Sequence, residues 1–322
     1  MSATTSDQRV PAEGVVVSEE LFAPISADVE LCYQTFGDPD DEPLLLVMGL
    51  GGPMTWWDPA LCTRLAQSGF YVVRFDNRDA GRSSRGKGRV TRTMLVRGFA
   101  GVRTRAPYTL DDLAGDALGL LDHLGLDAAH VAGVSMGGMI AQTMAITAPD
   151  RVRSLACIMS TTGHRRVGWQ HPVLLRNLLG RSSGREAYVA SSQVTWRLIG
   201  SPGYPQDPAA TRARAEETYD RGVSLAGMTR QMAAIVTQPD RTARLRELTV
   251  PTVVIHGLAD KMVHVSGGRA TASAIPDADI LLVDQMGHDL PPALNETFTD
   301  AIRRNADRAD RADRADRAGP GA

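Results

Sequence analysis

Short continuous runs of apolar residues recur along the chain and alternate with segments of helical apolar spacing. The runs cover residues 44–48, 71–76, 130–133, 152–159, 252–256 and 280–283. A run without polar alternation is typical of a strand covered on both faces, as in a parallel sheet with helices on each side. Less regular patterns predict two earlier strands, over residues 14–17 and 29–36.

Helix signals fall between these runs. Asp58 followed by Pro59 is a typical helix start, and Gly69 is placed to end that helix. Thr109 with Asp112 three residues later forms a capping pattern ahead of leucines at helical spacing. The alternation of strand and helix predicts an α/β fold with a mostly parallel, doubly wound sheet.

The alternation is interrupted between residues 160 and 248. Helical patterns over residues 171–180, 185–200 and 210–236 follow one another there, separated by Gly and Pro turns. We interpret residues 160–248 as a helical cap over the carboxyl edge of the sheet. The core would then consist of residues 14–159 and 249–304.

The last segment, residues 305–322, repeats Ala-Asp-Arg and ends in Ala-Gly-Pro-Gly-Ala. It offers nothing larger than alanine to bury. Pairs such as Asp307 with Arg311 could support a helix. We nevertheless predict a disordered tail.

Charge and composition exclude several classes. The 322 residues carry 35 basic and 37 acidic side chains, and this balance gives no general attraction to nucleic acid. Cys32, Cys62 and Cys157 stand alone in apolar surroundings, which predicts small core residues and neither a disulfide nor a metal site. No signal-peptide pattern or membrane-spanning run is found, so the sequence predicts a soluble cytoplasmic protein.

The sequence Gly133-Val134-Ser135-Met136-Gly137 fits the Gly-x-Ser-x-Gly pattern of a nucleophile elbow. An apolar strand pattern precedes it and a helical pattern, residues 136–148, follows it. A serine on so tight a turn has a strained backbone, and its neighbours two positions away must lack bulk. This context favours Ser135 as a nucleophile over a helix-capping serine.

A serine hydroxyl needs a base and a group that orients the base. Where this elbow occurs, the acid and then the histidine follow the serine in the chain, each in a loop after a strand. Asp260 follows the run 252–256, and His288 follows the run 280–283. The order and placement predict Asp260 as the acid and His288 as the base, although an acid in such a loop is also a common turn residue.

The glycine-rich turn Met48-Gly49-Leu50-Gly51-Gly52 directly follows the first buried run. The backbone N–H groups of Leu50 and Met136 are candidate oxyanion donors. A dinucleotide loop would need a third glycine at position 54, which is Met54, and Pro53 obstructs the helix start. No cofactor and no metal are therefore expected.

Apolar residues near these groups suggest a pocket for a hydrophobic ester or thioester, a small-molecule partner. The candidates for its lining are Gly49, Trp56, Trp57, Met139 and Trp196, and core packing is the alternative for each aromatic residue. Residues 78–105 mix basic and apolar side chains. Weak contact of this segment with an anionic membrane surface is an open alternative to a solvated loop with a short helix.

The strings LLLVMGLGG, RFDNRDAGRS, GVSMGGM, PTVVIHGLAD and QMGHDLP resemble those of the α/β-hydrolase superfamily, over roughly residues 25–302. The resemblance is to capped serine esterases and lipases of actinobacteria, among them aclacinomycin methylesterase and mycobacterial esterase/lipases. It implies a nucleophile at Ser135, an acid at Asp260, a base at His288 and oxyanion amides at Leu50 and Met136. The chain departs from the wider pattern at Met48, where many members have a histidine that steadies the loop.

Two rival functions stay open at this point. A cofactor-free haloperoxidase or perhydrolase would use the same three residues. A non-catalytic ligand receptor of the same fold is a second alternative, although such a receptor is expected to have lost part of the constellation. The sequence does not determine the acyl group, the leaving group or the oligomeric state.

Overall fold

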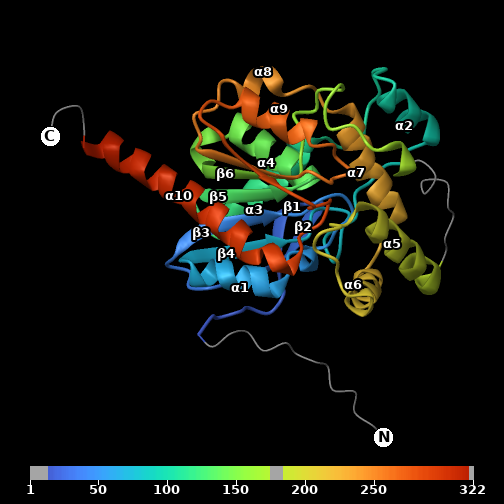
Figure 1. The fold of residues 1–322 in the computed structure, drawn as a ribbon, viewed down its shortest axis with the longest axis horizontal. Coiled ribbons are helices and arrows are strands. Elements are labelled where there is room, and N and C mark those ends of the chain that lie inside the picture. Colours follow the sequence, from blue (N-terminus) through green and yellow to red (C-terminus); the bar gives the residue numbers. More distant parts are fainter. Residues whose placement is uncertain (1–13, 175–183, 319–322) are drawn as a thin grey trace, which may run out of the picture.

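The computed structural model describes residues 14–174 and 184–318. In that part of the chain an eight-stranded sheet has the order β1-β2-β4-β3-β5-β6-β7-β8 (Figure 1). The strands are β1 (Leu21–Ser26), β2 (Val29–Phe36), β3 (Glu42–Val47), β4 (Phe70–Phe75), β5 (Ala129–Val134), β6 (Val152–Ile158), β7 (Thr252–Gly257) and β8 (Asp279–Val283). Neighbours from β4 to β8 are parallel, whereas β1, β2 and β4 pair antiparallel. The predicted α/β class with a mostly parallel sheet is confirmed.

The prediction of a strand over residues 14–17 is wrong. Residues 14–17 contribute a single antiparallel bridge, from Val17 to Phe36, and the edge strand is β1 instead. The sequence of β1 is LFAPIS, in which only Ala23 is buried and Leu21 and Phe22 are exposed. An edge strand with a proline and solvent-facing apolar side chains lacks the buried run that identifies the inner strands.

Helices cover both faces of the sheet. The helices α3 (Leu110–His123), α4 (Met136–Thr147) and α9 (Ser266–Ala274) contribute to the apolar cluster on one face. The helices α1 (Pro59–Gln67) and α10 (Asn295–Ala318) pack on the other face. The predicted caps are present, since Asp58 accepts from the Ala60 N–H and Thr109 forms a capping box with Asp112.

The segment between β6 and β7 is helical in its described part. It contains α5 (Arg185–Ile199), α6 (Pro208–Asp220), α7 (Leu225–Thr237) and the short α8 (Thr242–Leu245). Figure 1 shows α5, α6 and α7 grouped on one side of the molecule. Most of the helical pattern expected over residues 171–180 lies outside the described residues.

The basic and apolar segment 78–105 contains the short helix α2 (Arg92–Phe99), which packs against α7. Gly98 makes this contact possible, because a Cβ there would lie 2.5 Å from Val236. Val96 and Phe99 remain exposed on α2, and Arg92 and Arg97 are exposed beside them. Among the described residues, no helix combines the length and the apolar character needed to cross a bilayer.

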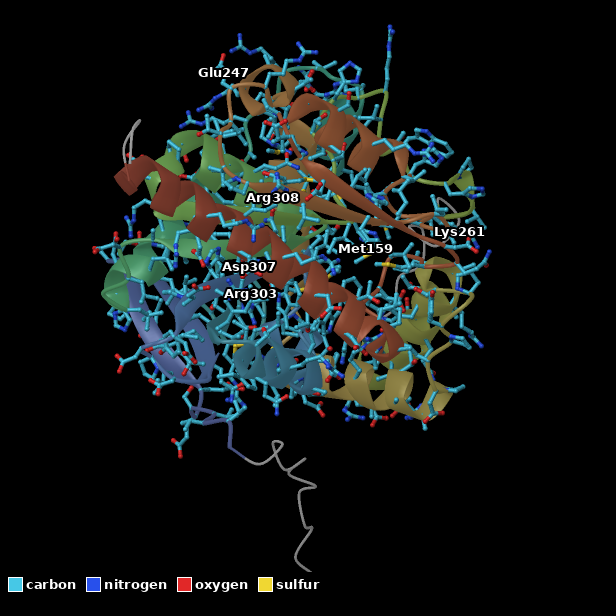
Figure 2. The ribbon with its side chains drawn as sticks, turned by 60° about the vertical axis from the view of Figure 1, so that its left-hand side comes forward. Met159, Glu247, Lys261, Arg303, Asp307 and Arg308 are labelled. Carbon is cyan, nitrogen blue, oxygen red and sulfur yellow. The ribbon has the colours of Figure 1, made fainter. Side chains whose placement is uncertain are left out.

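The predicted disordered tail is wrong for residues 305–318, which continue helix α10. Ala306 and Ala309 are buried, so small side chains allow the helix to lie close to its neighbours. The amide of Asn305 donates to the carbonyl oxygens of Leu155 and Pro251, each at 3.1 Å. Figure 2 shows Arg303, Asp307 and Arg308 along this helix.

Charged side chains add further anchors to α10. The Arg308 guanidinium bonds Asp279 of β8 at 2.7 Å, and Arg153 of β6 bonds Asp310 at 2.6 Å. The sequence alone shows nothing larger than alanine to bury in the Ala-Asp-Arg repeat. Its alanines and its ion pairs to the body of the protein explain why it is ordered.

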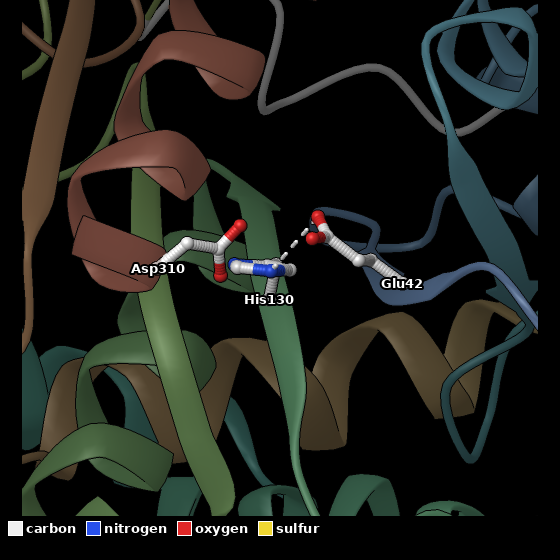
Figure 3. A group of neighbouring side chains, drawn as sticks. All are labelled: Glu42, His130 and Asp310. Atoms are coloured by element: carbon white, nitrogen blue, oxygen red, sulfur yellow. Dashed lines mark ion pairs between the residues drawn. The ribbon is translucent and has the colours of Figure 1, made fainter. Parts of the chain in front are cut away.

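Glu42, His130 and Asp310 offer possible metal-ligand atoms within 4.8 Å of one another (Figure 3). Both carboxylates already face arginines, because Arg303 lies 2.7 Å from Glu42 and Arg153 lies 2.6 Å from Asp310. Burial and these two arginines lower the pKa of His130 to about 3, which keeps it neutral. Glu42 and His130 lie at the starts of β3 and β5, the edge of the sheet opposite to Ser135. We interpret this cluster as an ion-pair network that ties α10 to the sheet.

Candidate active site

Ser135 lies between β5 and α4 with a left-handed backbone, φ 56° and ψ −117°. Only glycine fits at two positions of this turn. A Cβ at Gly133 would lie 2.2 Å from the Gly137 carbonyl oxygen, which is too close. A Cβ at Gly137 would lie 2.0 Å from the carbonyl oxygen of Val47. The Ser135 N–H donates to the Ile158 carbonyl at 2.8 Å, and the Ser160 hydroxyl donates to the Ser135 carbonyl at 2.7 Å. These two hydrogen bonds, one to the end of β6 and one from Ser160 just beyond it, hold the strained backbone of Ser135 in place.

His288 lies in the loop after β8. Its Nε2 is 3.0 Å from the Ser135 Oγ, and its Nδ1 is 2.7 Å from the Asp260 Oδ2. The loop is fixed from the end of α5, where the His288 N–H donates to the Ile199 carbonyl at 2.6 Å. A Cβ at Gly287 would lie 2.4 Å from that same carbonyl oxygen, so a glycine is required there.

Asp260 follows β7, and its side chain is fully buried. Its Oδ1 accepts from the backbone N–H groups of Met262 and Val263 at 2.8 and 2.9 Å, which leaves Oδ2 for His288. Two backbone donors orient the carboxylate and compensate its burial. With Nδ1–H donating to Asp260, the Nε2 of His288 is free to accept the serine proton.

A second histidine, His256, also faces Asp260. Its Nε2 lies 2.8 Å from the Val263 carbonyl oxygen and 3.5 Å from the Asp260 Oδ2. Burial lowers the pKa of His256, so a neutral ring donates from Nε2 toward these oxygens. From the sequence, His256 is an ordinary histidine at a strand end, and its contact with the acid was not anticipated.

The glycine-rich turn after β3 lies against the candidate nucleophile. A Cβ at Gly49 would be 3.2 Å from the Ser135 Cβ. The turn lacks the usual histidine at position 48, and other residues hold it. The Asn77 amide donates to the Met48 carbonyl at 2.9 Å, and the Gly51 N–H donates to the Gln231 side chain at 2.7 Å.

The segment Arg74–Ser83, conspicuous in the sequence, connects the core to α6 and α7. Asp76 pairs at 2.8 Å with Arg221, the residue directly after α6, and Asp79 pairs with Arg230 of α7 at 2.6 Å. Both carboxylates are fully buried, and Arg230 holds the pKa of Asp79 below its usual value against the effect of burial. Sequence reasoning missed these residues, although two acids in one strand-end loop were the available signal.

The expected pocket residues are only partly brought together. Trp56 and Trp196 meet edge to face with ring centroids 5.2 Å apart, and Trp56 donates to the Thr218 hydroxyl at 2.9 Å. Met139 is almost fully buried in the core. The expectation that Trp57 lines a pocket is wrong, because its side chain is fully buried in the apolar cluster under α1 and α10. An aromatic residue beside this turn suits the core as well as a pocket.

The two candidate oxyanion positions differ in their surroundings. Met136 is the first residue of α4, where backbone N–H groups have no partner within the helix. Leu50 is half-buried and packs against the core cluster of the α3 and α4 face. The geometry therefore keeps both amide positions next to the turn that carries Ser135.

A comparison with known proteins identifies the family of this chain. A family model described as alpha/beta hydrolase fold matches residues 42–291. The chain is 31% identical to rhodomycin D methylesterase DauP of Streptomyces sp. over 304 residues, which cover 85% of this chain and 94% of that protein. It is 29% identical to rhodomycin D methylesterase DnrP of Streptomyces peucetius, over 85% of this chain and 94% of the relative.

Solved structures share the fold. The enol-lactonase of Burkholderia xenovorans matches with a TM-score of 0.69 at 24% identity, over 88% of this chain and 99% of that chain. A hydrolase of Pseudomonas aeruginosa matches with a TM-score of 0.68, also at 24% identity, over 89% and 97% of the two chains.

Proposed function

The chain belongs to the family described as alpha/beta hydrolase fold, and on that premise we propose that it hydrolyses carboxylic esters with Ser135 as the nucleophile. The observation that carries the proposal is the unbroken contact from Ser135 Oγ through the His288 ring to Asp260, at 3.0 and 2.7 Å. Two relatives named as methylesterases, each matched over 94% of its length, support an ester as the substrate.

In the proposed reaction, His288 Nε2 takes the Ser135 proton while Oγ attacks the ester carbonyl carbon. Asp260 keeps the imidazole in the required tautomer and stabilises its positive charge. Collapse of the tetrahedral intermediate expels the alcohol, which receives the proton from His288, and leaves an acyl group on Ser135. A water molecule then repeats the sequence and releases the acid.

The developing oxyanion would be bound by the backbone N–H groups of Leu50 and Met136. The position of Met136 at the start of α4 supports this role, because a helix N-terminus favours negative charge. Two hydrogen bonds that hold the Leu50 turn support a preorganised site: Asn77 donates to the Met48 carbonyl, and the Gly51 N–H donates to the Gln231 side chain.

Gln231→Leu is expected to lower kcat by about 10- to 100-fold, because the turn that carries Leu50 loses its bond to α7 and a donor is displaced. Gln67→Leu, on the exposed surface of α1, is the matched control and should keep wild-type kcat. Steady-state kinetics on one p-nitrophenyl ester compares the two. Unchanged kcat in Gln231→Leu would argue against the assigned oxyanion turn.

We infer that residues 160–248 act as a cap over this site. The end of α5 bonds the His288 loop, α7 bonds the Leu50 turn, and Arg221, directly after α6, pairs with Asp76. The edge-to-face pair of Trp56 and Trp196 places aromatic surface between the core and α5. This supports a substrate with a hydrophobic acyl or alcohol part.

A panel of p-nitrophenyl esters of rising acyl length tests this assignment. We expect kcat/KM to rise from acetate to medium-chain esters by about 10-fold or more, since each buried methylene contributes about 0.8 kcal/mol. Peroxide-dependent halogenation, measured beside it, should stay at background. Equal kcat/KM for acetyl and longer acyl esters would contradict a hydrophobic pocket.

A further inference from the structure

A cavity of about 300 Å³ lies between α5, α6 and the loops that carry Lys261 and Asp289. Its volume falls at the lower end of the range for small-molecule sites. The wall combines Trp196 and three prolines, Pro202, Pro205 and Pro208, with a small set of charged side chains. Such a lining suits a compact organic molecule with one charged group.

Arg214 is the unusual member of this wall. Its Nε and Nη2 atoms are buried, and neither has a hydrogen-bond partner among the residues that the structure describes. The guanidinium lies over the Trp196 ring at 4.6 Å. By contrast, the buried guanidinium groups of Arg221 and Arg230 bond directly to carboxylates. Arg214 as a whole is partly exposed, but buried guanidinium nitrogens without such a partner are costly unless a ligand supplies one.

Asp289, the acid in the cavity wall, is not a hydrogen-bond partner of these Arg214 nitrogens. Asp289 accepts hydrogen bonds from the Ser201 hydroxyl and, at 2.8 Å, from the Gln206 amide. It influences Arg214 as a neighbouring charge, and burial lowers the pKa of Arg214 more strongly than this charge raises it. Arg197 and Lys261 also line the cavity, so cations outnumber acids there.

We propose that this cavity binds a small organic anion through a carboxylate held by Arg214. A guanidinium presents parallel N–H donors that match the two oxygens of a carboxylate. The prolines and Trp196 provide apolar surface for the body of the ligand, which favours an organic acid over an inorganic anion.

The cavity adjoins the candidate active site. Ser201 donates to Asp289 from the cavity wall and accepts from the Gly287 N–H at 2.8 Å, one residue before His288. The bound carboxylate therefore belongs either to the far end of an ester substrate or to a separate organic acid. The proposal goes beyond ester hydrolysis and does not depend on it.

Titration calorimetry with benzoate, at constant ionic strength, tests the site without any turnover. Benzoate is expected to bind the wild-type protein. The affinity of the neutral isostere benzamide should be lower by at least about 10-fold. Arg214→Gln should weaken benzoate binding by about 10-fold or more, with Arg214→Lys between the two. Arg212→Gln is the matched control, because Arg212 lies on the same helix but pairs with Glu216 at 2.8 Å and does not line the cavity.

Melting temperatures separate a ligand contact from a structural role. Arg214→Gln removes two buried nitrogens without hydrogen-bond partners and also the contact with the Trp196 ring, so its melting temperature should stay within about 3 °C of the wild type. A marked fall would make Arg214 a structural residue and overturn the proposal. Equal benzoate affinity in wild type and Arg214→Gln, or no binding to the wild type, would also overturn it.

Kinetics then distinguishes the two sources of the carboxylate. If the carboxylate belongs to the substrate, Arg214→Gln should raise KM for the p-nitrophenyl half-ester of glutaric acid more than for p-nitrophenyl butyrate. If a separate acid is bound, benzoate should bind equally well in the presence of either ester. Failure of ester hydrolysis itself would leave the calorimetric result unaffected.

Discussion

Ser135→Ala is expected to lower kcat for ester hydrolysis by about 10⁴-fold or more, with no loss of folded protein. The reason is that the variant lacks the oxygen that forms the acyl-enzyme, so only the oxyanion donors and binding can accelerate direct attack by water. The backbone turn is set by Gly133 and Gly137 and should persist with alanine. Steady-state kinetics, with circular dichroism as a check on folding, measures the effect.

The control for this variant is Ser68→Ala. Ser68 caps the end of α1 through a bond to the Leu65 carbonyl, away from the candidate site. Its kcat should match that of the wild type. Residual activity in Ser135→Ala within 10-fold of the control would require another nucleophile.

Asp260→Asn should reduce kcat by about 10³- to 10⁴-fold. The asparagine side chain can keep an oxygen toward the N–H groups of Met262 and Val263, and its NH₂ group then faces His288. A donor at that position favours the tautomer with the proton on Nε2, which cannot accept the serine proton. The same substitution removes the charge that stabilises the imidazolium.

Asp284→Asn is a suitable comparison, since Asp284 is exposed in the loop after β8. Wild-type kcat in that variant, beside a large loss in Asp260→Asn, would assign the effect to the buried acid. Comparable loss in both variants would instead indicate a general effect of charge near the site.

The inner strands and the three residues of the candidate site were predictable because both signals are local. The run 252–256 is fully buried in β7 and precedes Asp260, whereas the run 280–283 forms the edge strand β8, which is only partly buried, and precedes His288. The edge strand β1 lacked that signal because Leu21 and Phe22 face solvent. The order of residues 305–318 was missed because alanines gain burial only when the rest of the protein is present.

Contacts between residues that are far apart in the sequence could not be predicted. Gln231 bonds Gly51 across 180 residues, and no local pattern announces such a pair. The absence of a histidine at Met48 did indicate that the turn needs another support, but not which residue provides it. Arg214 likewise resembles any helical arginine until its buried, unpartnered nitrogens are seen.

Labelling with a fluorophosphonate, followed by intact-mass and peptide-mapping mass spectrometry, tests the central claim most directly. The reagent captures a serine whose hydroxyl is activated by a neighbouring base. We predict a single adduct on Ser135 in the wild-type protein, slower labelling in His288→Ala and no adduct in Ser135→Ala. An adduct on another residue, or undiminished labelling of Ser135→Ala, would contradict the account.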